Sequence, residues 1–116
     1  MIVRDGEVVA TGSNKVTINN DPTAHGEVMA IRNACTKLGV YDLKGCELYT
    51  SCEPCPMCLS SCYWANISKI YYGANQNDAA SFNFDDAFLY VEVAKAKKDR
   101  SIPIVEVKCT NKCEPF

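Results

Sequence analysis

The sequence predicts one α/β domain, residues 1–116, with a three-layer α/β/α architecture in which helices cover both faces of one mixed five-stranded sheet. Segments with strand and helix patterns alternate along the chain, and 116 residues suit a single hydrophobic core. The composition, 47% hydrophobic and 22% charged, excludes long disorder, collagen-like repeats and coiled coils. No apolar run approaches the roughly 20 residues needed to cross a bilayer, so we expect no membrane partner.

The N-terminal segment is predicted to form a β-hairpin with strands at residues 2–4 and 7–10. Asp5-Gly6 between them tolerates the positive φ angles of a type I′ turn. Residues 11–23 are polar and are predicted to form a loop. This loop ends at Asp21-Pro22-Thr23, a sequence suited to capping and starting a helix.

A first helix is predicted to follow, because apolar residues recur at helical spacing from Ala24 until Gly39 ends the run. Farther along, β-branched and aromatic residues predict strands, and a proline or an acidic residue marks the start of each helix. The expected elements are a strand at 46–50, a helix at 54–65, a strand at 67–72, a loop through Ser81, a helix at 86–98 and a strand at 102–107.

Cysteine is the unusual component of the composition. Eight of the 116 residues are Cys, and four of them lie between Cys52 and Cys62. The chain begins without a secretory signal pattern, so we expect a cytoplasmic location, where such clusters bind metal or carry thiol chemistry. The formal net charge of -2 provides no general basic field, so we expect no nucleic-acid partner.

The single His and two of the clustered Cys form a candidate metal site. His25 stands near the start of the first predicted helix, and Cys55 and Cys58 stand near the start of the second. In successive β-α units the helix N-termini emerge at the same edge of the sheet, so these residues can converge. One imidazole and two thiolates are typical of a catalytic zinc site, in which water takes the fourth position.

Glu27 lies two residues after His25 and can share its site only if His25 stands at the helix entrance. A carboxylate beside zinc-activated water can take up a proton and deliver it to a leaving amine. His-x-Glu followed by Pro-Cys-x-x-Cys is the general signature of zinc deaminases, in which the Glu is the general acid/base and not a ligand. The sequence therefore predicts Glu27 as catalytic and His25, Cys55 and Cys58 as ligands of one Zn²⁺.

Two interpretations from other classes remain open. The run Cys52-x2-Cys55-x2-Cys58-x3-Cys62 has the spacing of bacterial-type iron–sulfur proteins, although Tyr63 replaces their proline. That interpretation leaves the His and the Glu without a role, so we expect Cys52 and Cys62 to be buried thiols. The second is a non-catalytic, zinc-stabilised domain.

Four longer stretches narrow the choice: Asp21-Pro22-Thr23-Ala24-His25-Gly26-Glu27, Tyr49-Thr50-Ser51-Cys52-Glu53-Pro54-Cys55-Pro56-Met57-Cys58, Tyr63-Trp64-Ala65 and Phe84-Asp85-Asp86. Together they resemble the bacterial guanine deaminases of the cytidine deaminase-like superfamily, and the resemblance extends over essentially the whole chain. The last two stretches favour guanine deaminase. The zinc motif is shared with bacterial tRNA adenosine deaminases, which are the nearest alternative.

The resemblance implies hydrolytic deamination of guanine to xanthine and ammonia in purine catabolism, by a homodimer. It implies that Asn14 and Asp86 read the purine edge and that Trp64 walls the base pocket, directly or across the dimer interface. A tRNA substrate needs a basic groove, and we interpret the basic cluster at residues 95–100 instead as a solvated helix end.

The chain departs from the family pattern in two respects. Gly26 replaces an Ala between the His and the Glu, at a cost of about 1 kcal/mol in a helix. The family begins with a helix and most of a strand, including an aromatic that stacks on the base, and ends with a segment exchanged between subunits, whereas this chain starts at Met1 after the former and stops at Phe116 before the latter. We therefore expect a fold incomplete at both ends, impaired activity and association through a bare apolar surface.

Overall fold

The computed structural model describes residues 1–82 and 86–116, so Phe84 and Asp85 of the motif above lie outside the described residues. The strands are β1 (Ile2–Arg4), β2 (Glu7–Ala10), β3 (Glu47–Cys52) and β4 (Lys69–Ala74). The helices are α1 (Val16–Asn19), α2 (Gly26–Leu38), α3 (Pro56–Trp64), α4 (Gln76–Ala80) and α5 (Asp86–Ala94), followed by the 3-10 helix η1 (Lys97–Asp99). No helix in this described part of the chain is long and apolar enough to span a membrane.

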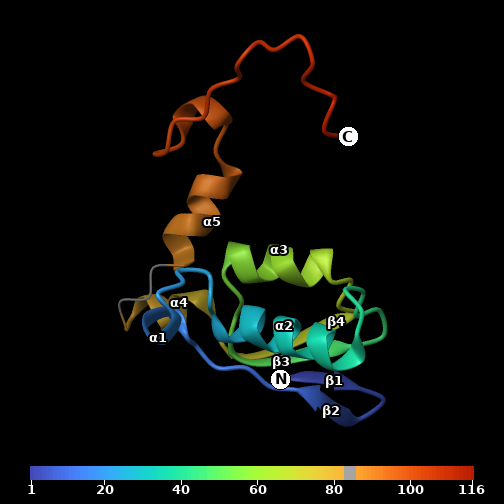
Figure 1. Ribbon diagram of the computed structural model, residues 1–116. Coiled ribbons are helices and arrows are strands. Elements are labelled where there is room, and N and C mark those ends of the chain that lie inside the picture. The colour runs from blue at the N-terminus through green and yellow to red at the C-terminus, as the bar shows by residue number, and fades with distance from the viewer. Residues whose placement is uncertain (83–85) are drawn as a thin grey trace.

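The strands form one mixed sheet in the order β2-β1-β3-β4, seen at the base of Figure 1. β1 is antiparallel to β2 and β3, whereas β3 is parallel to β4, with Leu48 opposite Ile70 and Tyr49 opposite Tyr71. Side chains alternate between the faces of a strand. Leu48 is buried, whereas Tyr49 and Tyr71 stack on each other and are 38% and 37% exposed.

The main apolar core joins α2 and α3 to one face of this sheet. Its buried members are Ile2, Ala30, Ala34, Leu43, Cys46, Leu48, Cys62 and Ala65. Many of them are small, which lets the helices approach the strands and each other closely. A second, smaller cluster of Val28, Cys55 and Cys58 packs the first turns of the two helices together. The helix starts are therefore held side by side by their own apolar contacts.

The turn and stop residues behave as predicted. Asp5 and Gly6 have φ angles of 52° and 77°, both positive as a type I′ turn requires. Gly39 ends α2 in the left-handed conformation, and its N–H donates to the carbonyl of Cys35. The predicted hairpin and the predicted end of the first helix are confirmed.

The first predicted helix begins two residues later than expected. Asp21 Oδ1 accepts hydrogen bonds from the N–H and the Oγ1 of Thr23, at 2.9 and 2.6 Å, and so closes a turn before the helix instead of capping it. His25 is the N-cap, and Gly26 is the first helical residue. This shift places His25 at the helix entrance.

Three further predictions about local structure are wrong. Pro56, not Pro54, is the first residue of α3. The helices α1 and α4 occupy segments predicted as loops, and α4 is nucleated by a capping box in which Asn75 and Asp78 each accept from the other's backbone N–H at 2.9 Å. Helices of four and five residues carry too little apolar periodicity to be recognised by pattern.

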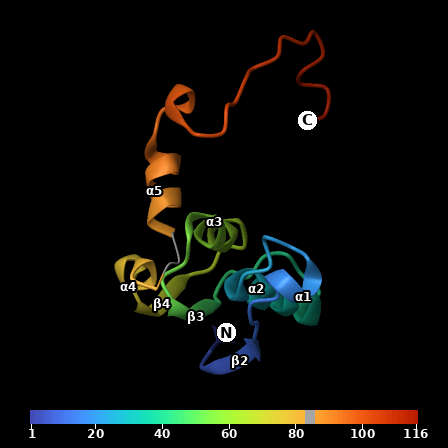
Figure 2. The ribbon, with the colours of Figure 1, turned by 90° about the vertical axis from the view of Figure 1, so that its left-hand side faces the viewer.

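The predicted strand at residues 102–107 does not form, so the described sheet has four strands instead of five. Ile102 and Val105 are 82% and 78% exposed. Figures 1 and 2 show that α5 and the residues after it lead away from the sheet. The segment therefore has no neighbouring strand with which to pair.

Candidate metal centre and base pocket

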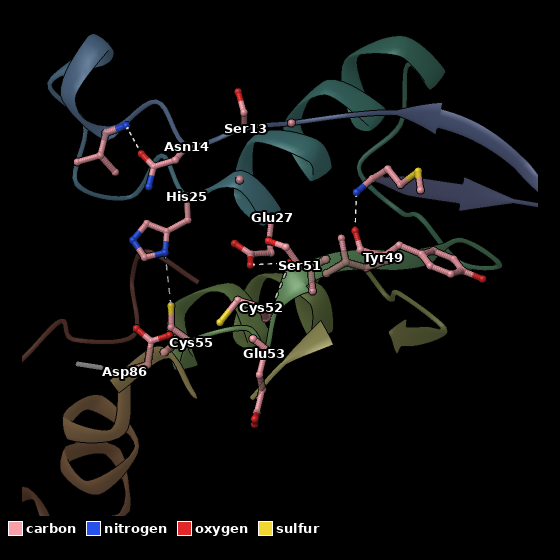
Figure 3. Close-up of a pocket in the computed structure, with 18 of the residues that line it drawn as sticks. Ser13, Asn14, His25, Glu27, Tyr49, Ser51, Cys52, Glu53, Cys55 and Asp86 are labelled. Carbon is pink, nitrogen blue, oxygen red and sulfur yellow. Dashed lines mark hydrogen bonds between the residues drawn. The ribbon is translucent and has the colours of Figure 1, made fainter. Parts of the chain in front are cut away.

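His25 and Glu27 reach the site from the entrance of α2. His25 is the N-cap, with extended backbone angles of φ -67° and ψ 156°, and Glu27 lies in the first turn. Because the His stands outside the regular helix, the two side chains are not forced onto opposite sides of it. Figure 3 shows both pointing toward the same space, with Cys55 below them.

Cys55 and Cys58 occupy the corresponding place at the start of α3. Cys55 is the N-cap, Cys58 follows in the first turn, and their side chains are 3% and 0% exposed. The free backbone N–H groups and the dipole at a helix N-terminus favour thiolate over thiol. The local structure thus places both sulfur atoms at a helix N-terminus, side by side.

The three candidate ligand atoms lie close enough to hold one metal ion. His25 Nδ1 is 3.7 Å from Cys55 Sγ and 3.5 Å from Cys58 Sγ, and all three atoms lie within 4.8 Å of one another. With bonds of about 2.0 Å to nitrogen and 2.3 Å to sulfur, tetrahedral zinc holds its N and S ligand atoms about 3.6 Å apart. The observed separations fit zinc bound by three protein ligands.

The two cysteines differ in acidity. The hydrogen bond with the Cys58 thiol lowers the pKa of Cys55 to about 6, helped by the backbone N–H of Cys58 and the charge of His25. The same hydrogen bond, burial and the charge of Glu27 raise the pKa of Cys58. Near neutral pH the pair therefore holds one thiolate and one thiol, and a metal ion displaces the remaining proton when it binds.

The carboxylate of Glu27 is contacted through both of its oxygens. The hydroxyl of Thr50 donates to Oε1 at 2.9 Å, and Cys58 Sγ lies 3.3 Å from Oε2. Thr50 was not predicted from the sequence as a site residue. The available signal was its position near the end of a strand that leads into the Cys-bearing helix, since the ends of such strands form the usual binding edge of an α/β sheet.

His25, Glu27, Thr50 and Cys55 line one side of a cavity of about 1010 Å³. Asn14, from the loop after β2, and Asp86, at the start of α5, line it as well. Figure 3 shows both directed to the space in front of His25 and Cys55. The structure thus brings two of the three predicted substrate-binding residues to the cavity that the candidate metal ligands face.

The amide of Asn14 has a defined orientation. Its Oδ1 accepts a hydrogen bond from the backbone N–H of Val16 at 2.9 Å. The Nδ2 group is therefore the end that can donate to a bound ligand.

Trp64 does not wall this cavity within one chain. It is the last residue of α3 and is 86% exposed, whereas the cavity lies at the other end of that helix. A nine-residue helix is about 13 Å long, which separates the two places. A role for Trp64 across a dimer interface stays a prediction.

The iron–sulfur interpretation loses its geometric basis. Among the described residues, the metal-sized group contains Cys55 and Cys58 but neither Cys52 nor Cys62. Cys62 belongs to the main core, where burial raises its pKa to about 11, and burial also raises the pKa of Cys52. An iron–sulfur cluster of this type needs four cysteine sulfur atoms around one site, and these two lie outside the group that contains Cys55 and Cys58.

Gly12, which was not predicted from the sequence as important, sets the distance between the loop that carries Asn14 and helix α2. A Cβ atom added to Gly12 would lie 2.2 Å from the backbone N of Ala30 and 2.6 Å from the carbonyl oxygen of Gly26. The loop that carries Asn14 can therefore rest directly on the first turns of α2 only because residue 12 has no side chain. The sequence signal that could have indicated this contact was a Gly in the loop after a strand, two residues before the predicted substrate-binding Asn14.

A model of the cytidine and deoxycytidylate deaminase zinc-binding region matches residues 1–74, more than half of the chain. The chain belongs to this deaminase family. Because the matched part is the family's zinc-binding region, the cofactor of this deaminase is zinc.

Known members of the family support the assignment. This deaminase is 53% identical over 116 residues to the guanine deaminase of Bacillus subtilis strain 168, a match that covers 100% of this chain and 74% of that protein. The solved B. subtilis structure superimposes with a TM-score of 0.95, at 53% identity, over 99% of this chain and 73% of that one. The predicted cytidine deaminase-like α/β fold is confirmed.

Other relatives match a shorter part of the deaminase. The tRNA-specific adenosine deaminase of Agrobacterium fabrum strain C58 is 45% identical over 74 residues, which is 64% of this chain and 49% of that protein. A solved structure in complex with 2,6-diaminopurine is 29% identical, with a TM-score of 0.69, and covers 73% of this chain and 49% of that one.

Proposed function

We propose that this deaminase catalyses the zinc-dependent hydrolytic deamination of guanine to xanthine and ammonia. The observation that carries the proposal is the grouping of the His25, Cys55 and Cys58 ligand atoms beside the cavity that Glu27 lines, in a chain that is 53% identical over its whole length to a guanine deaminase. The hydrolase class, acting on a cyclic amidine C–N bond, follows from the same match.

His25, Cys55 and Cys58 would hold the zinc ion, since their ligand atoms have the separations of a tetrahedral site. When bound, zinc supplies an activated water molecule at neutral pH. Glu27 takes the proton from the attacking water and passes it to the leaving amino group, which departs as ammonia. The hydrogen bond from Thr50 holds one oxygen of Glu27 while it does so.

Asn14 and Asp86 would select the base. The Nδ2 group of Asn14 can donate to an acceptor on the purine, because its Oδ1 is already occupied by the N–H of Val16. The carboxylate of Asp86 can accept from the N–H donors of guanine. Adenine offers no matching N–H donors and would leave the half-buried carboxylate of Asp86 unpaired, so this contact would distinguish guanine from adenine.

A tRNA adenosine substrate is the second candidate, because the A. fabrum relative shares 45% identity over 74 residues. In this structure, two cations of the basic cluster at residues 95–100 pair with groups of the chain itself, which disfavours their use in RNA binding. Lys95 pairs with Glu92 at 2.7 Å, and Arg100 donates to the carbonyls of Glu92 and Val93 at the end of α5. These two cations stabilise a helix terminus, as expected for a solvated helix end.

We further propose a homodimer in the cytoplasm, acting in purine catabolism as one domain. The support for association is apolar exposure on α5 and the segment after it, where Val91, Val93, Ile102 and Val107 are each more than half exposed. Single exposed apolar residues are normal on a monomer, whereas several along one segment favour a contact with another protein surface. Trp64, also exposed, would meet the base pocket of the partner subunit.

The proposal is tested by measuring ammonia release by the zinc-loaded protein from guanine, adenine, cytidine and a tRNA anticodon stem-loop. We expect turnover of guanine and a guanine preference that falls by at least about tenfold in Asp86→Asn, which exchanges an acceptor oxygen for a donor. Turnover of the RNA but not of guanine would contradict the proposal and favour a tRNA adenosine deaminase. Zinc binding without any turnover would favour the non-catalytic domain.

A further inference from the structure

We propose that Thr50 is a positioning residue that holds the carboxylate of Glu27 in the orientation needed for proton transfer. This inference rests on the proposed function, because it assigns a partner to the proposed general acid/base. Its basis is the hydrogen bond from Thr50 Oγ1 to Glu27 Oε1, at 2.9 Å. The bond joins β3 to the first turn of α2, between residues 23 positions apart in the chain.

The contact leaves the two oxygens of Glu27 with different surroundings. Oε1 is engaged by Thr50, on the β3 side, whereas Oε2 lies 3.3 Å from Cys58 Sγ, on the side of the candidate metal ligands. Hydrogen bonds to a carboxylate are charge-assisted and directional. Thr50 thereby fixes the plane of the carboxylate so that Oε2 faces the place where water and leaving group meet.

The hydroxyl of Thr50 is itself well placed. The backbone of Thr50 is fixed by pairing of β3 with β4, where it lies opposite Tyr72. A β-branched side chain has few χ1 rotamers. The same Oγ1 lies 3.1 Å from the carbonyl oxygen of Cys52, so both acceptors hold the hydroxyl on the same side of the strand. The shorter contact, to a charged acceptor, receives the proton.

The test compares Thr50→Val, Thr50→Ala and Thr50→Ser in the zinc-loaded protein. Val keeps the shape and removes the hydroxyl, whereas Ala and Ser form a pair that differs only in the hydroxyl. A loss of general acid/base alignment costs about 10- to 100-fold in rate. We expect kcat for guanine to fall by that factor in Thr50→Val and Thr50→Ala, with KM within about threefold, and Thr50→Ser to recover most of kcat.

Metal analysis and a matched substitution provide the controls. Each variant is expected to keep the zinc content of the parent protein, because Thr50 is not a candidate ligand. Thr36→Val makes the same chemical change at an exposed position of α2 and is expected to leave kcat unchanged. An unchanged kcat in both Thr50→Val and Thr50→Ala would overturn the proposal, as would an equal loss in Ala and Ser.

Crystal structures of the zinc-loaded parent, Thr50→Ala and Thr50→Ser provide a readout that does not depend on activity. We expect the Glu27 carboxylate to rotate or to occupy two conformers in Thr50→Ala and to regain its single orientation in Thr50→Ser. An unmoved carboxylate in Thr50→Ala would overturn the positioning role. If the parent protein does not deaminate guanine, the proposed function fails, and these structures still decide the role of Thr50 separately.

Discussion

Cys55 and Cys58 have the same side chain and lie on the same helical turn, yet their surroundings give them opposite acidities. Cys55 receives hydrogen bonds from the thiol and the backbone N–H of Cys58, which stabilise its thiolate, whereas Cys58 is buried beside the negative charge of Glu27. Acidity at this site is therefore set by position within the pair. The difference has a measurable consequence for metal binding.

Adding Zn²⁺ to the metal-free protein at about pH 7.5 is expected to release about one more proton per chain from the parent than from Cys58→Ser, because binding requires both thiols as thiolates and, of the two, only Cys58 is still protonated. At that pH Cys55, with its pKa lowered to about 6, is already ionised. Titration calorimetry in two buffers of different ionisation enthalpy measures the number of protons. Equal proton release by the parent and by Cys58→Ser would contradict the assigned acidities.

The sequence predicts some residues of the site well and others poorly. Contacts between residues close in the sequence leave a local pattern, whereas contacts between distant residues do not. His25 with Glu27, and Cys55 with Cys58, are local pairs whose spacing places them at a helix entrance, where the structure finds them. Asn14, Asp86 and Trp64 followed only from the family resemblance. Thr50 reaches Glu27 through the register of β3 beneath α2, which no local pattern encodes.

At the scale of elements, the site depends on two helix N-termini that meet at one edge of the sheet. Their meeting was predictable from the β-α order of the chain. The strand expected at residues 102–107 does not form. β-propensity shows that its side chains suit a half-buried sheet, but it does not show whether a partner strand lies nearby. The helix entrances also depend on a close backbone contact, between Gly12 and α2.

Gly12 and Gly26 are expected to respond in opposite ways to the same substitution. Gly12→Ala places a Cβ atom 2.2 Å from the backbone N of Ala30, so we expect a loss of about 1–3 kcal/mol in the free energy of unfolding. Gly26→Ala places its Cβ 3.6 Å from the Gly12 carbonyl, an ordinary contact, and restricts the unfolded chain, so we expect a gain of about 0.5 kcal/mol.

Urea unfolding of the two zinc-loaded variants measures both effects. Each variant is the control for the other, since both add one methyl group at the contact between the Asn14 loop and α2. Equal stabilities of the two variants would show that this contact does not constrain the loop.

At the scale of the whole molecule, the catalytic apparatus and the exposed apolar surface belong to different parts of the chain. The candidate ligands, Glu27 and most cavity residues lie in residues 12–82, on or beside the sheet. α5 and the residues after it lead away from that body (Figure 2), and all side chains from Ser101 to Phe116 are exposed. This chain accounts for 74% of the length of the B. subtilis guanine deaminase. The chemistry is therefore concentrated in the part that is best packed.

The central claim is that Glu27 carries the proton in guanine deamination and is not a zinc ligand. The most direct measurement is the rate of ammonia release from guanine by zinc-loaded Glu27→Gln, beside the parent protein and with zinc content determined for both. Gln keeps the size and the acceptor for Thr50 but cannot take up a proton. The account predicts the same zinc content as the parent and a rate lower by at least about 100-fold. A rate equal to that of the parent, at equal zinc content, would contradict it.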